Sequence, residues 1–243
     1  MSYILIIGAK SDIAKSLAIK YIENGYNLYL AARKSNEIKF FAKEISNKFN
    51  REVILLDFNI LEYNNHKFFF DNLKYRPIGI ICTVGLLGEQ KIAQKHFAES
   101  QLIIDTNYTG IVSFLNIVAC EFEKRKSGFI ICISSVAGDR GRKKNYIYGS
   151  AKSALSTYLS GLRNRVNKLN IHVMTVKPGF VYTKMTEGMN LPRLLTSTPS
   201  EIANDIYNAH MKRKNIIYSK SIWRLIMLII RNIPENYFKK TNI

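Results

Sequence analysis

The sequence predicts a single α/β domain built on a doubly wound parallel sheet. Short runs of β-branched and other apolar residues alternate with amphipathic helical patterns, which is typical of parallel strands joined by right-handed crossovers. The length of 243 residues suits one such sheet, and a hydrophobic content of 47% is sufficient for a large core. Repeats, low-complexity tracts and a clear linker are absent from the sequence.

The individual elements are predicted from the period of their apolar residues. Strands are expected at residues 3–7, 27–31, 53–56, 79–83, 128–134 and 172–177. Helices are expected at residues 11–24, 37–49, 63–73, 97–124 and 146–169. These elements form a predicted domain of residues 1–220, and a basic amphipathic tail follows at 221–243. In such sheets ligands bind where the carboxyl ends of the strands open.

The composition excludes several classes of protein. A net charge of +18 suggests a nucleic-acid partner, but the basic residues are scattered and no nucleic-acid-binding motif accompanies them, so we expect none. Cys82, Cys120 and Cys132 are odd in number and lie in apolar runs, which predicts reduced core thiols and no metal site. The chain begins directly with a strand and has no apolar stretch of spanning length, which predicts a cytoplasmic protein.

A candidate phosphate-binding loop follows the first strand. Gly8 precedes a predicted helix, and the free N–H groups at a helix N-terminus can hold a pyrophosphate. Gly8 is the only glycine of this loop, so an ordinary turn in which Ser11 or Asp12 caps the helix is an equal alternative. The residues expected to bind a dinucleotide here are Gly8, Lys10, Ser11, Asp12 and Ile13.

The ends of the second and third strands bear on the identity of the dinucleotide. An acidic residue after the second strand would bind a ribose 2′-hydroxyl, but Arg33 stands there. Arg33, with Lys34 or Lys10, is placed to bind a 2′-phosphate, which favours NADP(H) over NAD(H); a solvated arginine is the alternative. Asp57 closes the third strand, where it is placed either to reach an adenine amino group or to cap the strand end.

Tyr148 and Lys152 are candidate acid–base residues. Their four-residue spacing places both side chains on one helix face. An ammonium beside a phenol favours the phenolate form, so the phenol can deliver a proton to a carbonyl oxygen. Such a pair also arises by chance on solvated helices, and its meaning depends on the residues around it.

The surrounding residues occur in the order of a known family. The glycine turn, Asp57, the loop Thr83-Val84-Gly85, Asn107, Ser135, the Tyr148/Lys152 pair and Pro178-Gly179 match that order and spacing. On these residues the chain resembles the short-chain dehydrogenase/reductase family over most of its length. The resemblance implies a Rossmann-type fold and an NAD(P)-dependent oxidoreductase.

The resemblance also implies a role for each matching residue. Ser135 would bind the substrate carbonyl and Tyr148 would protonate it, whereas Ser134 is the less favoured serine. Lys152 would bind the nicotinamide ribose, and Asn107 would hold a water that links the lysine to solvent. The remaining cofactor contacts would come from Gly85, Pro178, Gly179, Val181 and Thr183, although Pro178-Gly179 alone also suits a tight turn.

Two segments depart from the family pattern. Cys82-Thr83-Val84-Gly85 replaces the usual Asn-Asn-Ala-Gly, and two of the three glycines of the first loop are missing. We therefore expect altered cofactor geometry at these points. The catalytic residues are intact, which favours an active enzyme over a non-catalytic relative.

Three runs resemble one subgroup, the reductases of decaprenylphosphoryl 2-keto-ribose: Val84–Gly88, Ser134–Arg140 and Trp223–Pro234. This resemblance implies hydride transfer to the C2 ketone of a polyprenylphosphoryl pentose in cell-envelope polysaccharide synthesis. That step completes a 2-epimerisation that a flavin-dependent oxidase partner begins. A soluble reductase of 3-ketoacyl or small polyol and sugar substrates is the alternative, because it would share every catalytic residue.

The tail has features of a membrane-surface helix. Residues 221–233 are largely apolar and too short to span a bilayer. Basic residues flank the run, namely Lys212, Arg213, Lys214, Lys220, Lys239 and Lys240. They predict peripheral contact with the inner face of the cell membrane or with a substrate lipid. The alternative is that this helix packs on the core or on a second subunit. Packing on a second subunit would accompany a homo-oligomer.

Overall fold

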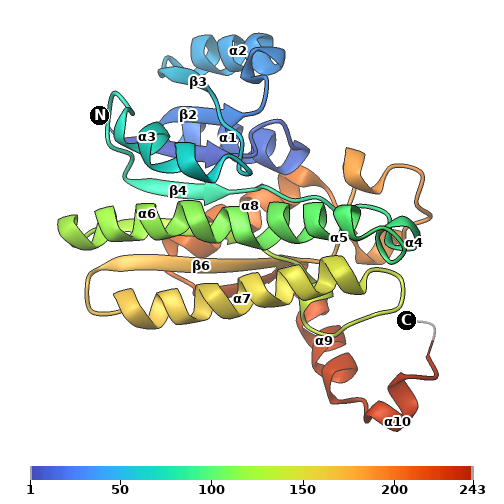
Figure 1. Ribbon diagram of the computed structural model, residues 1–243. Helices are drawn as coiled ribbons and strands as arrows, with labels where there is room; N and C mark the ends of the chain where they lie inside the picture. The colour runs from blue at the N-terminus through green and yellow to red at the C-terminus, as the bar shows by residue number, and fades with distance from the viewer. Residues whose placement is uncertain (1, 242–243) are drawn as a thin grey trace.

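The computed structural model describes residues 2–241 as a seven-stranded parallel sheet with helices on both faces (Figure 1). The strand order is β3-β2-β1-β4-β5-β6-β9, which confirms the predicted doubly wound sheet. The order reverses between β1 and β4, where a crevice forms at the carboxyl ends of the strands. The strands are β1 (Tyr3–Ile7), β2 (Asn27–Ala32), β3 (Val53–Asp57), β4 (Gly79–Cys82), β5 (Gly128–Ile133), β6 (Ile171–Pro178) and β9 (Ile216–Ser219).

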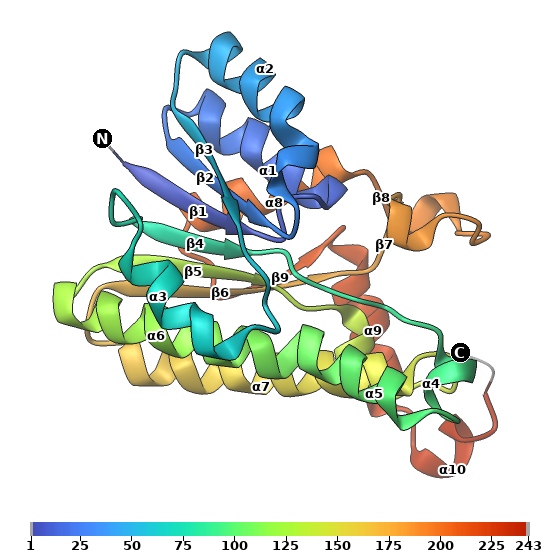
Figure 2. The same cartoon turned by 45° about the horizontal axis from the view of Figure 1, so that its top comes forward.

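Helices cover both faces of the sheet (Figure 2), and an apolar layer lies between the helices and each face. One lies under α3 (His66–Asp71), α6 (Gly110–Arg125) and α7 (Tyr146–Val166). The other lies under α1 (Asp12–Glu23), α2 (Lys39–Phe49) and α8 (Pro199–Met211). Alternate residues of β1 enter opposite layers, as Leu5 and Ile6 do. The central strands are therefore apolar along their whole length, because both faces of a parallel sheet are buried.

The predicted helix at 97–124 is interrupted by a π-helical turn. It consists of α5 (Phe97–Ile104), the π turn Asp105–Thr109 and α6. Among the described residues, the run Phe97–Arg125 is long and apolar enough to cross a membrane by length and composition, which the sequence analysis did not anticipate. Many of its apolar side chains, including Phe114 and Val118, are buried against the sheet, as in the core helix of a globular domain, whereas Phe97 is exposed.

Several elements were not expected from the sequence. They are α8, β9, the short pair β7 (Phe180–Val181) and β8 (Thr196–Ser197), and α4 (Gln90–Ala93). The start of α8 carries a signal that was overlooked, because Thr198 and Glu201 form a capping box with Pro199 in the first turn. Strand β9 is only four residues long and begins at the half-exposed Ile216, so its apolar pattern is weak.

The tail packs on the domain through one side of its helix. Trp223, Met227 and Ile230 of α9 (Ile222–Asn232) are buried in a small cluster with Val136, which confirms the predicted C-terminal amphipathic helix. The short helix α10 (Glu235–Phe238) follows, and the last two residues of the predicted tail lie outside the described residues. Cys120 lies exposed on α6, contrary to the expectation of a core thiol, because it stands on the solvent side of that helix.

His210 in α8 makes folding stability sensitive to pH. Its Nδ1 lies 2.9 Å from the Tyr21 hydroxyl, and its ring packs 4.1 Å from the ring of Phe129. Burial lowers the pKa of His210 to about 4, from 6.5. The unfolded chain therefore binds this proton first as pH falls, so the stabilisation is present above pH 6.5 and is lost towards pH 4.

We expect the free energy of unfolding to fall by about 2 kcal/mol through His210 between pH 7.5 and pH 5. Urea denaturation at both values measures this difference. The variant His210→Gln should lose the part of the pH dependence that His210 contributes, whereas His66 and His172, whose pKa values burial also lowers, keep theirs. His96→Gln, at an exposed position, should keep the full pH dependence. Equal pH dependence in the two variants would contradict the assignment to His210.

Candidate active site

Two adjoining cavities lie at the carboxyl ends of the strands. The first has a volume of about 200 Å³ and contains the predicted residues Lys10, Ser11, Asp12, Ile13, Gly85, Ser135, Tyr148, Lys152, Pro178, Gly179, Val181 and Thr183. The second, of about 340 Å³, shares part of this lining and adds Gly8 and Arg33. Together they form an elongated site that runs from the end of β2 to Tyr148.

Gly8 allows the first loop to approach the loop after β4. Its φ of +82° is left-handed, and a Cβ at this position would lie 2.8 Å from Thr83 Oγ1 and 2.9 Å from Val84 N. Ser11 begins α1 by accepting a hydrogen bond from Ala14 N at 3.1 Å, so it is the helix cap. The α1 N-terminus therefore lies at the cavity beside Gly8, which adds no side chain there, and this suits a pyrophosphate.

Lys152 is a buried cation at the other end of this site. Its side chain is 2% exposed, and Nζ donates to Ile133 O at 3.0 Å and to Val84 O at 3.5 Å. Within residues 2–241 no carboxylate lies at ion-pair distance from it. The Tyr148 ring lies 5.8 Å from Nζ, so the predicted pair is together on one face of α7.

The two neighbouring serines have different surroundings. Ser134 is buried, and its hydroxyl donates to Lys152 O at 3.0 Å and lies 2.8 Å from Ser156 Oγ. Ser135 lines the cavity beside Tyr148, and its Oγ accepts from Ala137 N at 3.1 Å. That bond uses the oxygen as an acceptor and leaves the O–H free to donate to a substrate.

A close approach of the backbone holds the serine loop against α7. A Cβ at Gly138 would lie 2.7 Å from both Lys152 C and Ser153 N, so a larger residue would push the two segments apart. The loop that carries Ser135 is thereby fixed relative to the helix that carries Tyr148.

Asn107 lies in the π turn and lines neither cavity. Its side chain is fully buried and bonded to the chain itself: Nδ2 donates to Leu86 O at 2.7 Å and to Ile103 O at 2.8 Å, and Oδ1 accepts from Leu86 N at 3.2 Å. The side chain therefore positions the loop after β4. A π turn within an α-helix is frequent at functional sites.

Asp57 and Lys10 have partners within the chain. Asp57 accepts from Ser35 N at 2.7 Å and lines neither cavity, which matches the alternative in which it caps a turn. Lys10 is paired with Glu37, an acidic residue that the sequence analysis did not consider, and this contact lowers the pKa of the Glu37 carboxyl. Arg33 is exposed and forms no ion pair within the described residues.

Asp12 joins the first loop to the segment after β7. Its Oδ2 accepts from Lys184 N at 3.0 Å, so the carboxylate fixes the turn that passes over the cavity. Met185 and Thr186 of the same turn line the cavity, and the sequence analysis overlooked both. No motif marks them, because their place depends on how this turn folds back.

A third cavity of about 490 Å³ lies on the other side of Tyr148 and Ser135. Its lining includes Arg142, Gln90 and Lys144, none of which was predicted as a site residue. Tyr148 and Ser135 line both this cavity and the first one, as do Gly179, Met185 and Thr186, so the two cavities adjoin at these residues. This geometry suits a ketone on one side and a dinucleotide on the other.

Comparison with known proteins identifies the family. The family model for short chain dehydrogenases matches residues 2–193. The chain belongs to the short-chain dehydrogenase family. It is an NAD(P)-dependent oxidoreductase.

Relatives and solved structures of this family resemble the chain over nearly its whole length. An uncharacterized oxidoreductase of Mycobacterium tuberculosis is 29% identical over 240 residues, which cover 98% of this chain and 96% of the relative. An NADP-dependent 3-hydroxy acid dehydrogenase of Schizosaccharomyces pombe is 27% identical and covers 90% of both chains. A short-chain dehydrogenase from Sphingobium yanoikuyae, in complex with NADPH, has a TM-score of 0.84 at 19% identity and covers 97% of both chains.

The two serines of this dehydrogenase give a direct test of their roles. Ser135→Ala should lower kcat/KM for ketone reduction by about 100-fold, because a donor to the carbonyl oxygen is lost, and should lower the free energy of unfolding by about 1 kcal/mol because Ala137 N loses its acceptor. Ser134→Ala should lower the free energy of unfolding by about 1 kcal/mol and reduce activity less than about 10-fold. Kinetics and urea denaturation of both variants measure these effects. The reverse pattern would exchange the roles of the two residues.

Proposed function

We propose that the protein reduces a sugar ketone with NADPH, and that its substrate is the C2 ketone of a polyprenylphosphoryl pentose. The observation that carries the proposal is that Tyr148 and Ser135 line both the dinucleotide site and the third cavity. A carbonyl in the third cavity and a nicotinamide in the first would meet at these two side chains. Bound NADPH supplies the hydride.

The chain itself supplies the proton and the stabilisation of negative charge. As C2 receives hydride, the Tyr148 hydroxyl donates its proton to the carbonyl oxygen and Ser135 donates a hydrogen bond to the same oxygen. The buried Lys152 ammonium favours the phenolate that results and is placed to bind the ribose hydroxyls. The product is an alcohol at C2 with inverted configuration relative to the sugar before its oxidation.

Two observations support a preference for NADPH. Arg33 lines the second cavity and has no carboxylate partner in the described chain, so it is available to a 2′-phosphate. The Schizosaccharomyces pombe relative is named an NADP-dependent enzyme. Glu37 works against binding of the 2′-phosphate, because its carboxylate is paired with Lys10 at the same end of the site.

The tail supports a lipid-linked substrate. Leu225, Leu228 and Ile229 of α9 are each more than half exposed on the side opposite Trp223 and Met227. The helix also contributes to the substrate side of the site, because Trp223 packs edge-on at 5.3 Å against Phe180, which lines the third cavity. An isoprenoid that leaves this cavity would therefore meet an exposed apolar surface.

On this proposal the enzyme works at the inner, cytoplasmic face of the cell membrane. Basic residues around α9 would contact anionic lipid headgroups, and the exposed apolar stripe would enter the interface. A flavin-dependent oxidase would supply the 2-keto sugar from the corresponding alcohol.

A soluble reductase of 3-ketoacyl or small polyol and sugar substrates is the second candidate. The Schizosaccharomyces pombe relative, which is named a 3-hydroxy acid dehydrogenase, favours it. In that case the exposed side of α9 would contact a second subunit.

The first test is NADPH and NADH oxidation by the purified protein, with polyprenylphosphoryl ribose and a matching flavin oxidase that generates the 2-keto sugar. We expect faster turnover with NADPH, and Tyr148→Phe should lower kcat by at least about 1,000-fold because the proton donor is lost. Turnover of 3-ketoacyl or simple sugar ketones alone would overturn the lipid-linked substrate. Unchanged activity of Tyr148→Phe would overturn the catalytic assignment.

A second test concerns the exposed side of α9. Replacement of Leu225, Leu228 and Ile229 by glutamine should weaken binding to phosphatidylglycerol vesicles by about 10-fold or more, because apolar contact area is lost. Cosedimentation with vesicles measures this binding, and phosphatidylcholine vesicles provide the uncharged comparison.

The matched control replaces three exposed phenylalanines elsewhere, Phe40, Phe68 and Phe97, by glutamine. It should leave vesicle binding unchanged. Light scattering on both triple variants reports the oligomeric state. A changed oligomeric state with unaltered vesicle binding would assign the stripe to a subunit contact.

A further inference from the structure

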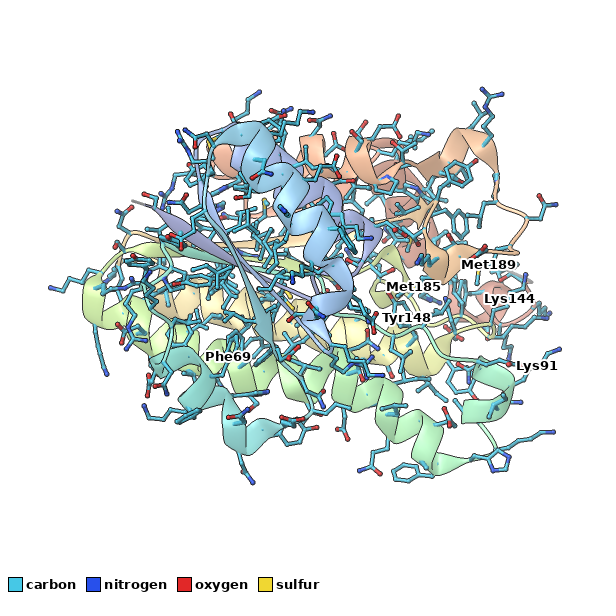
Figure 3. The ribbon with its side chains drawn as sticks, turned by 90° about the horizontal axis from the view of Figure 1, so that it is seen from above. Phe69, Lys91, Lys144, Tyr148, Met185 and Met189 are labelled. Atoms are coloured by element: carbon cyan, nitrogen blue, oxygen red, sulfur yellow. The ribbon has the colours of Figure 1, made fainter. Side chains whose placement is uncertain are left out.

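The third cavity carries positive charge that the chain does not neutralise. Arg142, Lys144 and Lys91 line it, and Glu89 is the carboxylate among its lining residues. Within residues 2–241 none of the three cations forms an ion pair. In Figure 3, Lys144 and Lys91 lie on the same side of Tyr148 as Met185 and Met189, further out from the centre of the molecule. A substrate that reaches Tyr148 from this side passes these cations.

Of these three cations, Arg142 contacts the interior of the fold. Its Nη2 donates to Val136 O at 3.3 Å and lies 3.3 Å from the Met227 sulfur of α9, whereas Nε is buried without a partner. Burial lowers the pKa of the Arg142 guanidinium, although the group stays charged. The nearby Asp139 favours the charged form, but its carboxylate is paired with Lys177. A bound anion would therefore supply the partner at ion-pair distance that the half-buried Arg142 lacks.

Two other half-buried arginines of the chain lie outside this cavity. Arg163 donates to Val173 O, Thr175 Oγ1 and Asn215 O. Arg125 donates to Pro77 O and lies 4.8 Å from the Phe122 ring, and its Nε is also buried without a partner. Arg142 differs because its unfilled donor belongs to a residue of the cavity that Tyr148 and Ser135 share.

Two further polar groups of the same lining lack partners. Gln90 Oε1 accepts from Ile147 N at 3.1 Å, which leaves the buried Nε2 without an acceptor. Asn145 Oδ1 is also buried without a donor. Buried polar atoms are normally hydrogen-bonded, and unpaired ones also occur elsewhere, at His66 Nε2, Arg125 Nε and His172 Nδ1. The third cavity is distinguished because three of them belong to residues of one lining. The cavity thus offers donors for an oxyanion and an acceptor for a hydroxyl.

We infer that this cavity binds the phosphate of a phosphorylated ketone, with Arg142 as the main donor. The inference rests on the proposed reductase function and specifies its substrate class. Arg142 contacts Val136, the residue after Ser135, so the phosphate lies close to the reacting carbonyl. The lining carries three cations and one carboxylate. This excess of positive charge suits a phosphate ligand better than a carboxylate ligand, because phosphate oxygens accept hydrogen bonds from several directions.

Dihydroxyacetone phosphate and dihydroxyacetone form a minimal pair of probes, because they differ only in the phosphate. In dihydroxyacetone phosphate, one methylene and one oxygen separate the phosphorus from the ketone carbon. NADPH oxidation by the full-length protein should show a kcat/KM at least about 10-fold higher for the phosphorylated ketone. Arg142→Gln should lower that value by about 10- to 100-fold and change the value for dihydroxyacetone less than about threefold. Arg142→Lys should recover part of the loss.

The control variant is Lys95→Gln, which removes one charge near α4 at an exposed position outside the cavity lining and should behave as the wild type. Acetoacetate and acetone form the corresponding carboxylate pair. An equal or larger Arg142-dependent advantage for acetoacetate would overturn the assignment to phosphate. Equal losses on both dihydroxyacetone substrates in Arg142→Gln would show a structural role and overturn the site.

Calorimetric titration of the NADPH-bound protein with glycerol 3-phosphate and with glycerol tests binding without turnover. Binding of glycerol 3-phosphate that Arg142→Gln weakens by about 10-fold or more supports the site, even where neither small ketone is reduced. Absence of both binding and a rate advantage overturns it. Ketone reduction that is independent of Arg142 leaves the reductase standing without the phosphate site. Arg142-dependent binding of glycerol 3-phosphate without any Tyr148-dependent reduction would leave the phosphate site standing and overturn the reductase function.

Discussion

The buried ammonium of Lys152 is the group around which the site is organised. It is surrounded by backbone carbonyls from the end of β5 and the loop after β4, and no carboxylate of the described chain neutralises it. Carbonyl dipoles compensate the cost of burial while the positive charge stays available to the Tyr148 phenol. This arrangement requires β4 and β5 to be adjacent and the N-terminal part of α7 to lie beside their carboxyl ends, and the fold meets both requirements.

The positions of the other site residues depend on how α7 is held in place. Ser134 ties the end of β5 to the carbonyl of Lys152, and Gly138 lets the serine loop lie directly on α7. Ser135 is then presented to the cavity by a loop held at both ends. Asn107 does the same for the loop after β4, because the π turn brings its amide to Leu86. Each of these contacts joins segments far apart in sequence, so the site forms only when the sheet is complete.

The sequence was informative where a local pattern has a direct spatial meaning. The spacing of Tyr148 and Lys152 fixes a common helix face, and residues after parallel strands share one edge of the sheet. It was uninformative where contacts are long-range. Glu37 reaches Lys10 across 27 positions, and Met227 reaches Arg142 across 85. Nothing in the sequence near Arg142 marks it as a cavity residue, because the other lining segments, such as residues 87–91 and 185–189, are brought to it only by the fold.

Helix α9 connects the chemistry to the surface of the molecule. Its buried side contributes Met227 to the surroundings of Arg142 and Trp223 to the packing of Phe180, both of which line the third cavity. Its opposite side carries the exposed stripe of Leu225, Leu228 and Ile229. On the proposed function, the head group and the lipid chain of one substrate would thus lie on two sides of the same helix. Changes confined to the exposed stripe would alter contact with lipid, whereas changes to the buried side would also alter the substrate cavity.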